Sequence, residues 1–400
     1  MATTKTAAAP CAIPLCVPEL AGNEWKYVKE CLDTGWVSSV GSFVPRFEAL
    51  LAARTGRRFA VATTSGTAAL HVALLVAGVR PDDEVLVSSL TFIAPANAIR
   101  YVGAWPVFVD ADPVYWQMDP DLVRNFLRND CRSKAGVLFN RTTGRRVSCI
   151  IPVHILGHPV DMRPLQELAC EFNLRIVEDA TESLGAQYRG KAVGNLGESA
   201  CFSFNGNKLI TTGGGGMLVT DNPGWAETAR MLTTQHKDDP IEYVHQRIGY
   251  NYRMTNVQAA LGVAQIERMD DLLAAKRRIA TAYRAALESL PGVGVMREAP
   301  WARSAFWMYT AMFDEHRFGM SARALLRELE SRGIQTRPLW QPIHCSPAHA
   351  GSLSLGGRVA EECYASALNL PCSAGLSVEQ QVGVIRAIRE IQQPASRRVV

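Results

Sequence analysis

The sequence predicts an α/β protein, with a large domain built on a mainly parallel β-sheet and a smaller α+β domain after it. Short β-branched runs alternate with longer helical patterns through the middle of the chain, as in βαβ units. Such an alternation implies a parallel sheet with both faces covered by helices. From about residue 257 the pattern changes to long and increasingly charged helical segments.

The individual elements follow from local patterns. The strand candidates are "EVLVSS", "PVFVD", "CIIPVHI", "LRIVED" and "ACFSF". The helix candidates are "GTAALHVALLVAG", "MRPLQELACEFN", one long helix beginning at "NVQAALGV", then "SARALLRELESRG" and "SVEQQVGVIRAIREI". We expect the first ten residues and the end, "QQPASRRVV", to fray. The predicted division is a tail over 1–20, a large domain over 21–265 and a small domain over 266–400.

Composition excludes several classes of protein. The net charge of +4 is small and dispersed, which argues against nucleic-acid binding. The ten cysteines form no C-x-x-C pair, so we expect neither a metal site nor a disulfide scaffold, but a reduced cytoplasmic protein. The start, "MATTKTAAAPCAIPLC", lacks the apolar core of a signal peptide, and no segment suits a membrane helix.

The stretch "SACFSFNGNKLITTGGGGMLVTD" places one lysine between a strand pattern and four glycines. The neighbours of Lys208 are apolar, small or amide-bearing, with no carboxylate beside it in sequence. A lysine held in such surroundings loses its proton readily and forms a Schiff base with a carbonyl compound. The glycines at 213–216 permit close approach of a ligand or a neighbouring strand. A solvated surface lysine and a tight hairpin are the competing interpretations.

Two carboxylates follow the run "LRIVED". Asp179 ends a buried strand, where a carboxylate is costly without a cationic partner, and the carboxyl ends of parallel strands are where ligands gather. Glu182 comes three residues later. A helix cap, a capping box or a local salt bridge would explain both residues without a ligand.

Phosphate and ring contacts have weaker candidates. Ser65, Gly66 and Thr67 open an apolar helix, whose free N–H groups and dipole favour an anion, although ordinary capping fits equally well. Phe92 follows a strand and is either core or a flat wall for a planar ring. The P-loop and dinucleotide-binding glycine patterns are absent from the sequence.

These signals together suit pyridoxal phosphate (PLP). This cofactor needs a lysine for its aldehyde, a carboxylate for its pyridinium nitrogen, donors for its phosphate and a wall for its ring. Asp179 would keep the ring nitrogen protonated, so that the ring accepts charge from the adjacent carbon.

The motifs "SGTAALH", "LTFIAPANAI", "VEDATESLGA", "CFSFNGNKLITTGGGGM" and "GYNYRMTNVQAALG" occur in this order over nearly the whole chain. The sequence thereby resembles the DegT/DnrJ/StrS nucleotide-sugar aminotransferases, which have the aspartate-aminotransferase (type I) PLP fold. The segments "WVSSVGSFVPRFE" and "TTQHKDDPIEYVH" look like the branch that serves bacillosamine and legionaminic acid synthesis. That branch implies transfer of the amino group of L-glutamate to C4 of a UDP-linked 2-acetamido-2,6-dideoxy-4-ketohexose.

The resemblance implies roles for individual residues. Lys208 matches the lysine that holds the cofactor, Asp179 the partner of the ring nitrogen, and Glu182 a residue near the ring hydroxyl, where many members have His or Gln. Asn251 matches an asparagine that reaches the phosphate of the neighbouring subunit, which implies a homodimer with shared sites. The predicted cofactor-binding residues are Ser65, Gly66, Thr67, Phe92, Asp179, Glu182, Ser203, Lys208 and Asn251, with Lys208 also catalytic.

Other functions stay open on the sequence alone. One is amination of a GDP-linked 4-keto-6-deoxymannose, as in perosamine synthesis. Others are a non-catalytic PLP-binding regulator and an α/β protein without a cofactor. For the sugar site, Arg253 and Lys237 are candidates for a diphosphate, and Trp36, Ser38 and Ser39 for its border, although surface charge and packing explain them equally well.

Overall fold

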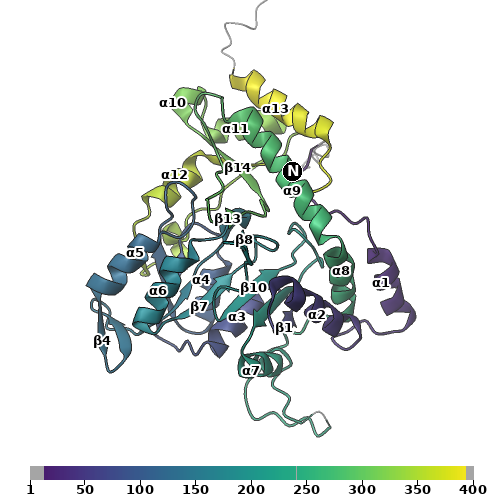
Figure 1. Ribbon diagram of the computed structural model, residues 1–400, viewed down its shortest axis with the longest axis vertical. Helices are drawn as coiled ribbons and strands as arrows, with labels where there is room; N and C mark the ends of the chain where they lie inside the picture. The colour runs from purple at the N-terminus through teal and green to yellow at the C-terminus, as the bar shows by residue number, and fades with distance from the viewer. Residues whose placement is uncertain (1–12, 240, 393–400) are drawn as a thin grey trace, which may run out of the picture.

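The computed structural model describes residues 13–239 and 241–392. Figure 1 shows a broad sheet-and-helix layer with a smaller layer above it, joined by the long helix α9 (Met269–Leu287). Both ends that we expected to fray lie outside the described ranges, apart from Gln392, the last residue of α13.

A sheet of eight strands forms the centre of the large layer, in the order β1-β11-β10-β7-β6-β2-β3-β16. Among these strands only β11 runs antiparallel to its neighbours. The strands are β1 Phe59–Thr63, β2 Glu84–Ser88, β3 Trp105–Val109, β6 Val147–Ile151, β7 Arg175–Asp179, β10 Ser199–Ser203, β11 Gly216–Thr220 and β16 Leu353–Leu355. The predicted α/β class with a mainly parallel sheet is confirmed.

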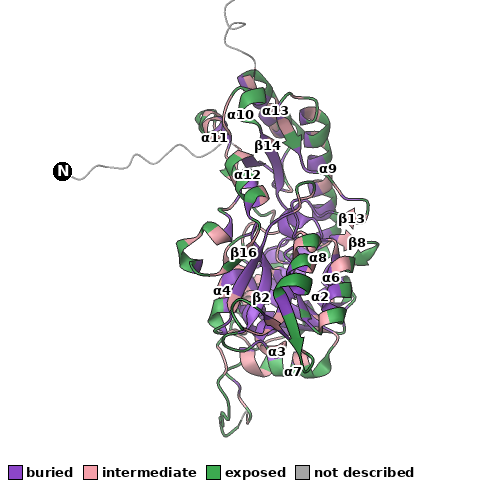
Figure 2. Cartoon of the chain, turned by 90° about the vertical axis from the view of Figure 1, so that its left-hand side faces the viewer, coloured by how far each residue is buried: buried purple, intermediate pink, exposed green. Residues whose placement is uncertain are grey.

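Helices cover both faces of this sheet, as Figures 1 and 2 show. Neighbouring residues of one strand enter different cores: Ile150 belongs to the cluster that includes α2, α6 and α8, and Ile151 to the cluster of α3, α4 and α7. Both residues are fully buried. The helices of this layer are α1 Glu24–Asp33, α2 Phe43–Thr55, α3 Gly66–Val76, α4 Ala94–Tyr101, α5 Pro120–Asn125, α6 Met162–Phe172, α7 Pro223–Thr233 and α8 Asn256–Glu267.

The smaller layer is built on an antiparallel sheet in the order β12-β14-β17-β15. Its strands are β12 Val293–Val295, β14 Tyr309–Phe313, β15 Arg337–Pro338 and β17 Ala367–Leu370. Besides α9, the helices here are α10 Glu315–Phe318, α11 Ala322–Ser331, α12 Arg358–Ser366 and α13 Val378–Gln392. Two small sheets complete the fold. One pairs β4 Cys131–Lys134 with β5 Val137–Asn140, and the other has the order β13-β8-β9, from β8 Gln187–Tyr188, β9 Lys191–Ala192 and β13 Ala302–Arg303.

Two features differ from the expected elements. The single long helix expected from residue 256 is two helices, because Arg268 leaves helical geometry at φ −106° and ψ 7°. α8 packs on α1 and α2, whereas α9 runs into the smaller layer, so tertiary packing imposes a break that no glycine or proline announces. The strand β16 returns from the C-terminal region to pair with β3 of the large sheet. The domain boundary at residue 265 stays a prediction.

No helix within the described ranges combines the length and the apolar character that crossing a membrane requires. The cytoplasmic location that we expected stays a prediction.

A buried carboxylate fixes the end of the central strand β7. Oε1 of Glu178 accepts hydrogen bonds from the backbone N–H groups of Leu196 and Gly197, at 2.7 Å each. Oε2 accepts from the N–H of Gly194 at 2.9 Å and from Nε2 of His154 at 3.2 Å. Burial alone would raise the pKa of Glu178, but the His154 hydrogen bond and these backbone donors hold it below its usual value.

Replacing this carboxylate tests its importance to the fold. In Glu178→Gln an amide N–H₂ must face backbone N–H groups, so buried donors lose their acceptor. We expect a loss of about 3 kcal/mol in the free energy of unfolding, measured by urea denaturation. Glu171→Gln, which changes an exposed carboxylate paired with Arg128, should stay within about 0.5 kcal/mol of wild type. Equal stability of the two variants would contradict this account.

Candidate active site

A cavity of about 270 Å³ opens at the carboxyl ends of the strands of the large sheet. All but one of the predicted cofactor-binding residues line it: Ser65, Gly66, Thr67, Phe92, Asp179, Glu182, Ser203 and Lys208. These residues come from four strand ends and the loops after them, so the fold brings together segments up to 143 residues apart (208 − 65). Asn251 does not line the cavity.

Lys208 lies in the loop after β10 and is nearly enclosed, with a side chain 13% exposed. Its Nζ lies 3.6 Å from the centre of the Trp307 ring and 3.9 Å from Oε1 of Glu182. Burial lowers the pKa of Lys208, against the opposing effect of the Glu182 and Asp179 carboxylates. Burial therefore makes the Lys208 amine easier to deprotonate, and so more nucleophilic, than the amine of a free lysine.

Asp179 and Glu182 are the two carboxylates of the cavity. Asp179 is buried, and its Oδ1 accepts a hydrogen bond from the N–H of Thr181 at 3.1 Å. Burial raises the pKa of Asp179 and raises that of Glu182 to about 7, because each charge has lost water. Oε2 of Glu182 accepts from the N–H of Leu156 at 2.7 Å. No helix follows β7, so the capping interpretation of these two residues is wrong.

The N-terminus of α3 forms one end of the cavity. The Ser65 side chain caps it by accepting from the N–H of Ala68 at 3.0 Å, which leaves the N–H groups of Gly66 and Thr67 without a partner inside the helix. A Cβ added to Gly66 would lie 2.9 Å from Cβ of Ser203, so only glycine allows this close packing. Both the capping and the anion-binding interpretations of Ser65 thus have a structural basis.

Gly216 shows what the glycine run does. A Cβ there would lie 2.4 Å from the carbonyl group of Ser65, so β11 passes directly against the entry to α3. Glycine therefore permits a close approach here, but the neighbouring segment is the start of helix α3 and not the strand that we expected.

Aromatic rings form the remaining wall. Phe92 is 52% exposed and lies at 6.4 Å from Trp340, ring centre to ring centre. Trp340 stacks on Trp307 at 6.3 Å with an angle of 8° between the rings. Both tryptophans come from the smaller layer and were not predicted. The sequence signals were "AFWMYTAMF" and "RPLWQP", which local patterns assign to a strand and a turn without indicating that they reach the site.

Other candidates lie elsewhere. Neither Arg253 nor Lys237 lines the cavity. Arg253 instead forms an ion pair with Glu48 at 2.5 Å, and Nζ of Lys237 lies 4.3 Å from the centre of the Tyr243 ring. Both ring nitrogens of the buried His154 are hydrogen-bonded, to Glu178 and to the N–H of Val160, so this histidine has a structural role.

The cavity suits pyridoxal phosphate. It offers an amine of lowered pKa and a buried carboxylate, and it has helix N–H groups without internal partners beside a glycine that keeps the space open. An exposed phenylalanine borders the same space.

The family comparison agrees with this geometry. Residues 18–389 match the DegT/DnrJ/EryC1/StrS aminotransferase family. The chain is 42% identical to the GDP-perosamine synthase of Caulobacter vibrioides, over 95% of this chain and 98% of that protein. It is 38% identical to the GDP-perosamine synthase of Escherichia coli O157:H7, over 94% of this chain and 98% of that protein. The aminotransferase TlmJ from Streptoalloteichus hindustanus has the same fold, with a TM-score of 0.84, 28% identity and coverage of 95% and 98%.

These relatives correct one expectation. The proteins of highest identity named here are GDP-perosamine synthases, so the likeness to the UDP-linked bacillosamine and legionaminic acid branch is not supported. The cavity lining suits the cofactor, and together with the family match it argues against an α/β protein that binds no cofactor. The chain belongs to the DegT/DnrJ/EryC1/StrS aminotransferase family and is a PLP-dependent nucleotide-sugar aminotransferase.

Proposed function

We propose that this enzyme transfers the amino group of L-glutamate to C4 of a GDP-linked 4-keto-6-deoxymannose. The observation that carries the proposal is the near-complete alignment, at 42% and 38% identity, with two relatives named GDP-perosamine synthase. The earlier alternative thus replaces the UDP-linked sugar as the preferred substrate.

The residues of the cavity suit the proton transfers of such a reaction. PLP, when bound, accepts the electron pair left by the broken C–H bond. We propose that Lys208 holds the cofactor, removes the proton from Cα of L-glutamate and later delivers one to C4 of the sugar. A single amine can do both, because burial lowers the pKa of Lys208 and so makes its proton easier to remove than that of a free lysine.

The remaining groups would hold and polarise the cofactor. Asp179 would pair with the ring nitrogen, and its burial strengthens that interaction because little water competes for the charge. Glu182 would lie near the ring hydroxyl, while Gly66, Thr67 and Ser203 would bind the phosphate. Trp307, stacked on Trp340, would exclude water from the Lys208 amine.

We also propose a homodimer in which Asn251 completes the site of the neighbouring subunit. Asn251 is exposed and lies outside its own cavity. It follows a long loop that projects beyond α7 in Figures 1 and 2 and carries exposed Ile241 and Ile248, at 81% and 83%. Exposed apolar side chains on a projecting loop are typical of a contact with another chain.

Lys208→Arg tests the catalytic amine. Arginine keeps the positive charge but loses no proton near neutral pH, so we expect 2-oxoglutarate formation to fall by roughly a thousandfold or more. Lys191→Arg, an exposed lysine in β9, should keep the wild-type rate. A Lys208→Arg protein that folds normally by circular dichroism and keeps its rate would refute the assignment.

A substrate panel tests the sugar. Purified enzyme is given L-glutamate with a GDP-linked 4-keto-6-deoxymannose or with a UDP-linked 2-acetamido-2,6-dideoxy-4-ketohexose, and the product at C4 is identified by NMR. We expect kcat/KM to be at least about a hundredfold higher with the GDP-linked sugar, because the site must discriminate both the base and the 2-acetamido group. Preference for the UDP-linked sugar would restore the original expectation.

Mixed subunits test the shared site. Lys208→Arg and Asn251→Ala chains, each inactive alone, are unfolded and refolded together. Random pairing makes half of the dimers hybrids, each with one intact site, so activity should recover to about a quarter of wild type. No recovery, with hybrid dimers demonstrated by two affinity tags, would exclude a contribution of Asn251 across the interface.

A further inference from the structure

A buried lysine outside the proposed cofactor site is surrounded by two cysteines. Lys276, in α9, is 3% exposed. Its Nζ donates hydrogen bonds to the carbonyl oxygens of Cys372 at 2.6 Å and Trp307 at 2.9 Å. Sγ of Cys16 lies 3.4 Å from the same nitrogen, and Sγ of Cys372 lies 3.9 Å from it.

Within the ranges that the structure describes, Lys276 forms no ion pair with a carboxylate. A buried ammonium without an anionic partner is unfavourable by several kcal/mol. The group that can supply the negative charge is a thiol of the cluster. Free lysine holds its proton about two pH units more tightly than free cysteine, so the proton shared by Nζ and Sγ stays on nitrogen.

We propose that Cys16 is held as a thiolate by Lys276 and is a modification site for small electrophiles and peroxides. Cys16 suits this role better than Cys372, because Cys16 is partly exposed whereas Cys372 is fully buried. The carbonyl oxygen of Asn207, 3.4 Å from Sγ of Cys16, would accept a bond from a protonated thiol. One weak S–H bond is a smaller effect than an unpaired buried charge, so the thiolate form prevails.

The positive charges around Cys16 all lower the pKa of its thiol. A hydrogen bond from the Cys372 thiol and the charges of Lys276 and Lys208 lower the pKa of Cys16 to about 6, although burial opposes them. The pKa of Cys372 is raised by its hydrogen bond to Cys16, so Cys372 remains the protonated partner.

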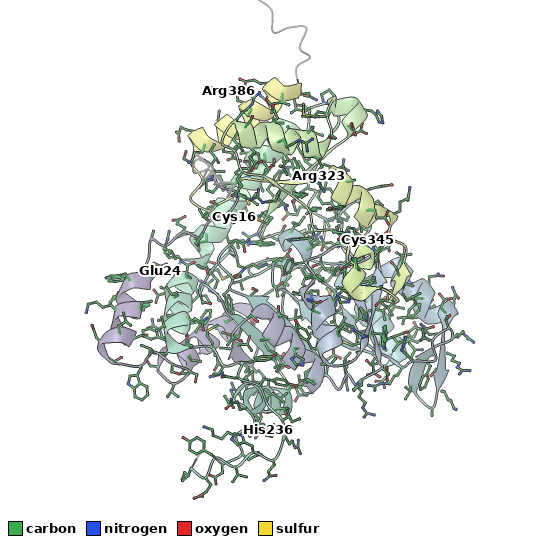
Figure 3. The ribbon with its side chains drawn as sticks, turned by 180° about the vertical axis from the view of Figure 1, so that it is seen from behind. Cys16, Glu24, His236, Arg323, Cys345 and Arg386 are labelled. Carbon is green, nitrogen blue, oxygen red and sulfur yellow. The ribbon has the colours of Figure 1, made fainter. Side chains whose placement is uncertain are left out.

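The two cysteines are also joined through their backbones. The N–H of Cys372 donates to the carbonyl oxygen of Leu15 at 2.7 Å, and the N–H of Val17 donates to Oγ of Ser373 at 3.0 Å. Figure 3 places Cys16 where the N-terminal segment meets the smaller layer. The two sulfur atoms therefore belong to adjoining segments, and both lie beside the Lys276 nitrogen, at 3.4 Å and 3.9 Å. A disulfide between them is part of the proposal.

Oxidation by hydrogen peroxide would proceed in two balanced steps. The Cys16 thiolate attacks a peroxide oxygen, which breaks the O–O bond, forms Cys16–SOH and releases hydroxide that is protonated to water. The sulfur of Cys372 then attacks the Cys16 sulfur, loses its proton and displaces hydroxide, which leaves as the second water. Two thiols are oxidised by two electrons in total, and one peroxide is reduced to two waters.

The pH dependence of alkylation tests the thiolate. Full-length PLP-loaded enzyme is treated briefly with iodoacetamide between pH 5 and 9, and each cysteine is followed by peptide mass spectrometry. Cys16 should reach half of its maximal rate near pH 6. Cys345, whose pKa is raised by burial, provides an internal reference that keeps gaining rate at higher pH. A Cys16 midpoint above pH 8 would overturn the proposal.

Two variants test whether Lys276 is the cause of the Cys16 reactivity. Lys276→Met should slow alkylation of Cys16 at pH 7 by at least about tenfold, because the thiolate loses its ammonium partner. Arg278→Met removes an exposed positive charge from the same helix and should leave the Cys16 profile unchanged. If Lys276→Met does not fold, the wild-type profile still decides the question.

Peroxide treatment tests the bridge. Wild-type enzyme should yield a Cys16–Cys372 linked peptide that dithiothreitol removes, whereas Cys372→Ser should stop at Cys16–SOH and react with dimedone. If peroxide modifies the exposed Cys170 and Cys345 before Cys16, the assignment of Cys16 as the peroxide-reactive thiol is wrong. If wild-type enzyme forms no linked peptide, the disulfide step with Cys372 is wrong.

Discussion

The position of the carboxyl end of β7 is the constraint on which the site depends. Glu178 and Asp179 are consecutive, and the pleat of the strand directs their side chains to opposite faces. The Glu178 carboxylate binds backbone N–H groups of Gly194, Leu196 and Gly197 and the ring of His154, while Asp179 faces the cavity. A slip of the strand by one residue would exchange the two carboxylates, so the buried network keeps the second one aimed at the site.

Both layers of the molecule contribute to the cavity, although they come from parts of the chain that are far apart in sequence. The large sheet supplies the carboxylates, the helix N-terminus and Lys208, whereas the smaller layer supplies Trp307 and Trp340. Nε1 of Trp307 donates to the carbonyl oxygen of Asn207 at 2.6 Å, immediately before Lys208. Trp307 therefore shields the Lys208 amine from solvent and also holds the loop that carries Lys208. The burial of Lys208 thus depends on the packing of the smaller layer against the large one.

Sequence patterns predicted the cavity residues that come from the large sheet, but not those that come from the smaller layer. The strands ending at Asp179 and Ser203, and the helix beginning at Gly66, show strong local patterns, which also pointed to Phe92 and Glu182 as candidates. The family resemblance added Ser203, which lines the cavity, and Asn251, which does not. The tryptophan wall, the break at Arg268 and the return of β16 to the large sheet depend on contacts between distant segments. Local sequence patterns do not report contacts between distant segments, so these features could not be predicted from single segments.

By itself, the sequence determined the α/β class, the order of the main elements and the cofactor chemistry, because apolar periodicity, glycine freedom and the types of polar residue at strand ends are local properties. Only the tertiary structure decided that Lys208 lies beside Glu182 and Trp307 in one cavity, and that Lys276 is buried against Cys16 and Cys372. The physical reason is that a side chain's proton affinity depends on burial and on neighbouring charges, and those are fixed when distant segments pack together.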